Sequence, residues 1–222
     1  MSAVTAAAPA PAGEPTEAVL FDFGGVLFNW QPVVLLQQVL PEHARSDEEA
    51  LALASTVFQS FLPGSDWAEF DRGVASLAEV RDRIAARTGL PAEGVHRLIE
   101  AIPHHLAPLA DSVAWLERLV AAGTRLHFLS NMPVPYKAHL LREHAFLGHF
   151  RSGVFSCDVK QIKPNADIFQ TTAEALGLNP ARTLFIDDNP HNIQTAREQG
   201  WRAVRFVNAA QAEAEARQLG WL

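Results

Sequence analysis

Short apolar runs that alternate with helical patterns constrain the fold of this chain most strongly. Five runs have the pattern of buried strands bounded by polar or turn-forming residues: AVLFDF (18–23), RLHFLS (125–130), GVFS (153–156), TLFID (183–187) and RAVRF (202–206). Three segments between the later runs carry apolar residues at helical spacing: 111–123, 165–177 and 192–200. This alternation predicts an α/β fold with a doubly wound parallel sheet, a Rossmann-like core.

The first strand is followed by a long stretch in which no strand is predicted. Residues 31–105 contain only helical patterns, at 33–40, 47–62, 76–89 and 92–102. In an open α/β sheet, ligands bind beyond the carboxyl ends of the strands, so an insertion after the first strand is expected to cover the site as a cap. We therefore predict the following division: a disordered tail at 1–17, a core formed by 18–30 and 106–222, and an all-helical cap at 31–105.

Charge and composition narrow the possible partners. The 25 acidic and 18 basic residues give a net charge of −7 without a Lys/Arg cluster, which excludes the usual electrostatic footprint for nucleic acid or an anionic membrane. No apolar run approaches the roughly 18 residues of a membrane span. The only cysteine, Cys157, excludes an intrachain disulfide and fits a reducing compartment, and we interpret it as a buried structural thiol. These features predict a cytoplasmic protein with a small-molecule partner.

Reactive side chains follow four of the predicted strands. They are Asp22 after the first, Ser130 and Asn131 after the second, Lys163 after the third, and Asp187 with Asp188 after the fourth. Each has a structural alternative: a turn, a helix cap, a solvated charge or an Asx turn. Because parallel strands bring their carboxyl ends to one edge of a sheet, the four groups together favour a functional site over four unrelated caps.

These residue types are suited to phosphoryl chemistry. Asp22 and Asp188 offer the hard oxygen ligands that Mg²⁺ prefers, with a backbone carbonyl after Asp22 as a further ligand. Ser130 and Asn131 can donate hydrogen bonds to phosphoryl oxygens. Lys163 supplies positive charge and can keep Asp22 ionised as a nucleophile. A carboxylate that attacks phosphorus forms an aspartyl-phosphate intermediate.

The same residues resemble the four motifs of the haloacid dehalogenase superfamily. FDFGGVL is similar to its first motif, LSN to its second, Lys163-Pro164 to its third and IDDNPHN to its fourth. The insertion resembles the helical cap of the first subfamily, which contains small sugar-phosphate phosphatases and 2-haloacid dehalogenases. The resemblance implies Asp22 as nucleophile and Ser130 as phosphate ligand, with Lys163 stabilising the charged site. It also implies Asp188 and the Gly24 main-chain oxygen as Mg²⁺ ligands, with Asp187 as a supporting acid.

One position departs from the pattern of the superfamily's phosphatases. They normally carry a second Asp two residues after the nucleophile, as general acid and base, and here that position is Gly24. General acid–base catalysis contributes about 10²–10⁴-fold to a rate. Replacements left open are a metal-bound water, His191 or a cap residue. Asp66 and Arg72 are the cap candidates, although we interpret both as solvated or structural charges and His191 as a surface residue.

The predicted function is hydrolysis of a small organic phosphate monoester by a Mg²⁺-dependent phosphatase, with a sugar phosphate among the candidates. One alternative is a 2-haloacid dehalogenase, whose relatives typically carry Tyr at the position of Gly24 and Ser or Asn in the fourth motif. The acidic pair Asp187-Asp188 favours the metal over dehalogenation. The other alternative is a phosphate-binding pseudoenzyme, against which the presence of Asp22, Lys163 and both fourth-motif acids argues.

Overall fold

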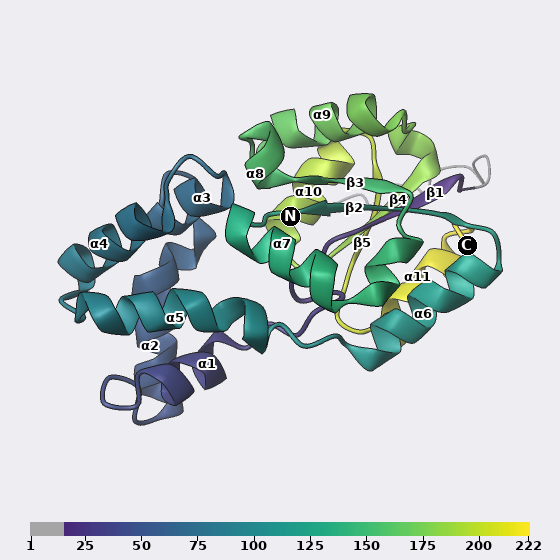
Figure 1. Cartoon of the computed structure of the whole chain (residues 1–222). Helices are drawn as coiled ribbons and strands as arrows, with labels where there is room; N and C mark the ends of the chain where they lie inside the picture. The colour runs from purple at the N-terminus through teal and green to yellow at the C-terminus, as the bar shows by residue number, and fades with distance from the viewer. Residues whose placement is uncertain (1–15) are drawn as a thin grey trace, which may run out of the picture.

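The structure, a computed structural model, describes residues 16–222, which form one five-stranded parallel sheet flanked by helices (Figure 1). The strands are β1 (Ala18–Phe21), β2 (Arg125–Ser130), β3 (Ser152–Phe155), β4 (Thr183–Asp187) and β5 (Arg202–Arg205). Their spatial order is β3-β2-β1-β4-β5, so the chain changes direction across the sheet at β1. A crevice at such a switch point is where α/β sheets bind ligands.

Both faces of the sheet are covered because strand side chains alternate between two helical layers. Val19 and Phe21 pack in one hydrophobic cluster with α6 (Ala110–Ala121) and α11 (Ala209–Gln218). Ala18 and Leu20 pack in the other cluster with α9 (Ala166–Leu176) and α10 (Pro190–Glu198). A strand buried on both faces is apolar at consecutive positions, as β1 is. The predicted α/β class and parallel sheet are confirmed.

A helical insertion separates β1 from α6 in the sequence. It consists of α1 (Pro32–Val39), α2 (Asp47–Phe58), η1 (Gln59–Phe61), α3 (Asp66–Asp71), α4 (Leu77–Thr88) and α5 (Ala92–His105). Figure 1 shows these helices gathered at one end of the sheet. Side chains of Ser46, Ser65 and Ser76 accept backbone N–H groups at the starts of α2, α3 and α4.

Local structure differs from the sequence prediction in three places. Residues 66–71, which lie between the predicted helical patterns 47–62 and 76–89, form α3. A helix this short shows no apolar periodicity, so the sequence did not reveal it. Helix α5 continues through Pro103 to His105, three residues beyond the predicted helical pattern at 92–102. The segments α7 (Val134–Glu143), η2 (Ala145–His149), α8 (Ser156–Val159), η3 (Pro180–Arg182) and α11 were not predicted.

The predicted tail, residues 1–17, lies outside the described residues except for Thr16 and Glu17. The Glu17 N–H donates to the carbonyl of Arg182, and Arg202 donates to the Thr16 hydroxyl. None of the helices within residues 16–222 has both the length and the apolar character that a bilayer crossing requires.

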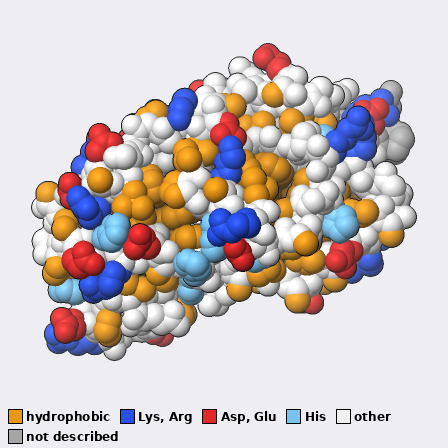
Figure 2. Space-filling view, in the orientation of Figure 1, with side chains coloured by type: hydrophobic (Ala, Val, Ile, Leu, Met, Phe, Trp, Pro, Cys, Tyr) orange, Lys and Arg blue, Asp and Glu red, His pale blue; other side chains and the backbone are white. Residues whose placement is uncertain are grey.

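The surface carries basic and acidic side chains close to one another. Figure 2 shows this mixture on one face, with hydrophobic side chains gathered between the helical insertion and the sheet. Cys157 is buried in α8, and burial raises the pKa of its thiol, as expected for a structural cysteine.

Candidate active site

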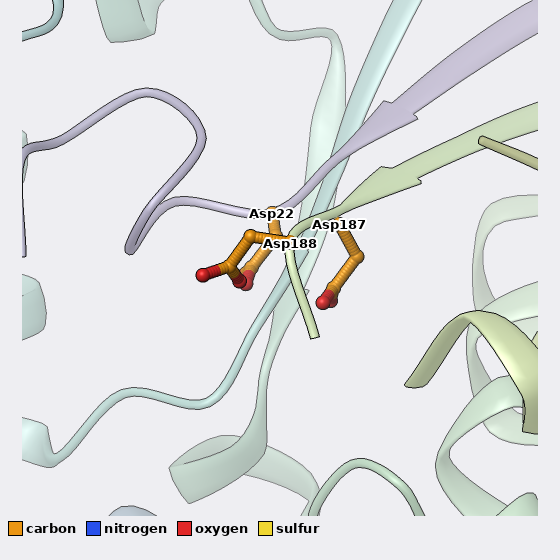
Figure 3. A group of neighbouring side chains, drawn as sticks. All are labelled: Asp22, Asp187 and Asp188. Atoms are coloured by element: carbon orange, nitrogen blue, oxygen red, sulfur yellow. The ribbon is translucent and has the colours of Figure 1, made fainter. Parts of the chain in front are cut away.

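Three carboxylates meet where β1 and β4 end. Asp22 follows β1, Asp187 is the last residue of β4 and Asp188 comes next (Figure 3). One carboxylate oxygen from each lies within 4.8 Å of the others. The parallel pairing of β1 with β4, in which Phe21 lies opposite Ile186, brings these strand ends together.

Lys163 bridges two of these acids from the loop after α8. Its Nζ lies 2.8 Å from Asp22 Oδ1 and 2.6 Å from Asp187 Oδ2. Only 1% of the Lys163 side chain is exposed. Burial by itself lowers the pKa of Lys163, but the charges of Asp187 and Asp22 outweigh it and raise the pKa above its usual value. The lysine is therefore a permanent cation between two carboxylates.

The two acids of the fourth motif have different surroundings. Asp187 is fully buried and accepts hydrogen bonds from Lys163, from the Asn189 backbone and from the Asn192 side chain. Asp188 is exposed and lines the cavity described below. Asp187 is thus positioned to hold Lys163 in place, whereas Asp188 presents its carboxylate to a ligand.

The cluster has the electrostatics of a cation site. Burial raises the pKa of Asp22 to about 7; Lys163 opposes this rise, and Asp187 and Asp188 add to it. Burial and the Asp187 charge raise the pKa of Asp188 to about 6. A bound cation would stabilise the ionised forms of these neighbouring carboxylates, which otherwise repel one another. Carboxylate oxygens are also the ligands that Mg²⁺ prefers. The residues present therefore fit this metal ion.

Ser130 and Asn131 lie at the end of β2. Within residues 16–222, the buried Ser130 hydroxyl has no hydrogen-bond partner, but Ser130 is not among the residues that line the cavity described below. The Asn131 side chain donates to the Lys163 carbonyl (3.0 Å) and accepts from the Lys163 N–H (2.9 Å). Asn131 also lines the cavity, and its reciprocal hydrogen bonds fix the loop that carries Lys163.

The Gly24-Gly25 pair has two different local environments. Gly25 has φ +73°, and a Cβ there would collide with the Asp188 carboxylate. Its lack of a side chain lets the loop after β1 approach Asp188 closely. A Cβ on Gly24 would meet no atom of residues 16–222 within 4 Å. The position two residues after Asp22 is therefore open space within the described part of the chain.

A cavity of about 590 Å³ lies over these residues, between the strand ends and the helical insertion. Asp22, Gly24, Lys163 and Asp188 contribute to its polar end. Much of the rest is apolar and is formed by Trp30, Phe61, Leu62, Trp67, Ile102 and Met132. Two of the aromatic residues pack against Phe58. Its ring stacks on Phe61 with 5.5 Å between the ring centroids and meets Trp67 edge-on at 4.9 Å.

Part of this apolar wall comes from a segment whose backbone has the left-handed conformation. Gln59, Ser60 and Phe61 have φ angles of 48°, 52° and 55°, and none of them is glycine. Such backbone costs about 1–3 kcal/mol per residue and clusters at ligand sites. It directs Ser60, Phe61 and Leu62 into the cavity lining, and Leu62 is 61% exposed.

The cap residues singled out from the sequence do not line the cavity. Asp66 pairs with Arg87 at 3.0 Å, and Arg72 pairs with Glu69 at 3.3 Å, as expected for structural charges. His191 does line it, from the first turn of α10.

Two charged residues that line the cavity were not singled out from the sequence: the buried Asp71 and the exposed Arg205. Asp71 ends a helix that the pattern did not reveal, so the sequence carried no signal of its direction.

Known proteins resemble this chain over most of its length. A sesquiterpene phosphatase, astK of Aspergillus oryzae, is 25% identical over 91% of this chain and 96% of its own. A HAD family enzyme of Bacteroides thetaiotaomicron, solved with magnesium and inorganic phosphate, has a TM-score of 0.66 at 21% identity, covering 86% of this chain and 93% of that one.

A second solved structure has the same fold but belongs to a dehalogenase. It is the L-2-haloacid dehalogenase of Xanthobacter autotrophicus with chloropropionic acid covalently bound, with a TM-score of 0.66 at 22% identity over 92% of this chain and 82% of that one. The profile of the haloacid dehalogenase-like hydrolases matches residues 16–200. The chain therefore belongs to the haloacid dehalogenase-like hydrolase family.

Proposed function

We propose that this hydrolase is a Mg²⁺-dependent phosphatase that cleaves organic phosphate monoesters through an aspartyl-phosphate on Asp22. The observation that carries the proposal is the Lys163 ammonium held between Asp22 and Asp187, beside the exposed Asp188 carboxylate. A dehalogenase that uses no metal has no need for three clustered acids. A protein that only binds phosphate has no need for a buried nucleophile with its own counter-ion.

Each residue has a distinct role in this scheme. Asp22 attacks phosphorus, and Lys163 favours the ionised form of Asp22 and neutralises charge on the phosphoryl oxygens. The Ser130 hydroxyl, free of protein partners among the described residues, donates to a phosphoryl oxygen. Asp22, Asp188 and the Gly24 carbonyl hold Mg²⁺, which supplies positive charge to the transferring group when bound. Asp187 orients Lys163.

The helical insertion, residues 31–105, acts in this proposal as a cap of the first-subfamily type. Its contribution to the cavity is mostly aromatic or aliphatic, with Ser60 and Asp71 as the polar exceptions. A sugar needs several hydrogen-bond partners for its hydroxyl groups, and this wall offers few. An alcohol with a bulky apolar group fits better, and the sesquiterpene phosphatase among the relatives supports the same substrate class.

Phosphate release from a panel of monoesters tests the proposal. The panel contains p-nitrophenyl phosphate, octyl phosphate, a terpenoid monophosphate and glucose 1-phosphate, each with Mg²⁺ and with chelator. We expect release that requires Mg²⁺, with the apolar alkyl esters preferred over glucose 1-phosphate. Asp22→Asn keeps the shape but removes the nucleophile, and we expect it to fold and to release no phosphate.

A pair of leucine variants tests the substrate class separately. Leu62 and Leu51 are 61% and 64% exposed, but only Leu62 lines the cavity. We expect Leu62→Ala to lower kcat/KM for the terpenoid ester about ten-fold, while Leu51→Ala leaves it unchanged. Release from no ester contradicts the phosphatase, and a preference for glucose 1-phosphate contradicts only the apolar substrate.

A further inference from the structure

The proposed reaction needs a proton that the first motif does not supply. When the ester bond breaks, an alkoxide leaves, and an alkoxide is a poor leaving group unless it is protonated. Gly24 carries no side chain to do this, and the space beside it is open. We therefore look for the donor among the other side chains that line the cavity.

Few titratable side chains line the cavity besides Lys163 and the acids at the ends of β1 and β4. Tyr136 donates its hydroxyl to the Ile99 carbonyl at 2.7 Å and is thereby occupied. Arg205 does not release a proton in proteins. His191 is exposed on the first turn of α10. Asp71 is the remaining group, and it is only 6% exposed.

Backbone contacts with the sheet domain fix the position of Asp71. The Ser156 hydroxyl donates to the Asp71 carbonyl and accepts the Met132 N–H at 2.8 Å. Two residues further on, Lys160 Nζ donates to the Gly73 carbonyl at 2.7 Å. The end of α3 is thus anchored on α8, next to the residues that follow β2. The side chain of Asp71 has no hydrogen bond or ion pair within residues 16–222, although it lines the cavity.

We propose that Asp71 is the general acid and base of this site, supplied by the helical insertion in place of the absent side chain at position 24. As Asp22 attacks, its oxygen bonds to phosphorus, the ester P–O bond breaks, and the Asp71 carboxyl proton passes to the leaving oxygen. Water then bonds to phosphorus, the Asp22–phosphorus bond breaks, and the water proton returns to Asp71. The products are the alcohol and phosphate, with both aspartates regenerated.

The electrostatics of Asp71 agree with this role. Burial raises the pKa of Asp71 well above its usual value, and the Asp22 charge adds to the rise while Lys163 opposes it. A carboxyl group in such surroundings keeps its proton to a higher pH than an exposed aspartate does, as a general acid requires.

Single-turnover kinetics of Asp71→Asn test this inference, which rests on the proposed phosphatase activity. Octyl phosphate has a poor leaving group and p-nitrophenyl phosphate a good one. We expect Asp71→Asn to slow alcohol release from octyl phosphate about 10²–10⁴-fold, while the burst of p-nitrophenol changes little. Phosphoenzyme then accumulates with p-nitrophenyl phosphate, because the water step has lost its base. Glu69→Gln, on the same helix, is the control and is expected to change neither.

A second variant separates catalysis from folding. Gly24→Asp in the Asp71→Asn background places a carboxyl group in the open space beside Asp22, and we expect it to restore octyl phosphate cleavage. If the Asn variant does not fold, Asp71→Ser serves the same comparison. Equal slowing of both esters overturns the role of Asp71 and leaves the phosphatase intact. Wild-type protein that cleaves neither ester contradicts the phosphatase itself.

Discussion

Lys163 Nζ lies 2.8 Å from Asp22 Oδ1, so a cation carried by the loop after α8 meets the carboxylate that follows β1. The two residues are 141 positions apart in sequence, and only the parallel sheet brings them together. Lys163 is also bonded to Asp187, and one ammonium therefore neutralises two carboxylates that would otherwise repel one another.

Removing this cation should damage both stability and turnover. Lys163→Met leaves Asp22 and Asp187 without their counter-charge, and breaking a buried ion pair costs about 3–5 kcal/mol. We expect a comparable loss in the free energy of unfolding by urea and no detectable phosphate release. Lys137→Met removes a partly exposed lysine paired with Asp158 and should change stability by about 1 kcal/mol or less. Similar losses in the two variants would argue against the central role of Lys163.

Substitutions of the two acids of the fourth motif should have different effects on Mg²⁺ binding and on stability. Asp188 faces the cavity, so Asp188→Asn should raise the Mg²⁺ concentration that gives half-maximal rate, by about ten-fold or more. Asp187→Asn disturbs a buried carboxylate that holds Lys163 and Asn192, and it should lower the rate at saturating Mg²⁺ and the unfolding temperature. Rate measured against Mg²⁺, together with thermal unfolding, separates the two. Identical Mg²⁺ curves would contradict the assignment.

Most of the sheet could be predicted from the sequence because its central strands, β1, β2 and β4, are buried on both faces. Runs such as TLFID are then apolar throughout, and the polar residue that ends each run is conspicuous. The same logic located Asp22, Ser130, Lys163 and the Asp187-Asp188 pair, which the structure brings to one edge of the sheet.

The helical insertion was harder to predict at the level of single residues. Helix α3 is six residues long, too short for an apolar period, and its direction decides that Asp71 rather than Asp66 lines the cavity. The left-handed segment at Gln59–Phe61 gives no sequence signal because it contains no glycine. Contacts between α3 and α8 place Asp71, and such contacts are set by tertiary packing.

The glycine pair after Asp22 should tolerate substitution unequally. A Cβ on Gly25 collides with the Asp188 carboxylate and sits on a backbone with φ +73°. We expect Gly25→Ala to lower the unfolding temperature and to raise the Mg²⁺ requirement, because Asp188 must move. The Cβ of Gly24→Ala meets no atom of the described residues within 4 Å, so this variant should unfold at the wild-type temperature or slightly above. Mg²⁺ titrations and thermal melts of both variants check this. Equal effects of the two substitutions would show that the close approach of the loop to Asp188 does not require glycine at position 25.

Asp71 should also leave a signature in the pH dependence of stability, measured in chelator so that no metal contributes. The unfolded chain loses the Asp71 proton near pH 3.9, whereas burial raises the pKa of Asp71 in the folded chain. Between these two pKa values the folded state binds more protons, so wild-type stability falls as pH rises, by about 1.4 kcal/mol per pH unit at most. The Asp71→Asn variant has no titrating group at position 71, so its stability does not include this loss. We expect the two proteins to unfold at similar temperatures near pH 4 and the variant to become the more stable one as pH approaches 8, whereas Glu69→Gln follows the wild type. Parallel curves for Asp71→Asn and wild type would show that Asp71 is ionised at neutral pH and could not donate the proton.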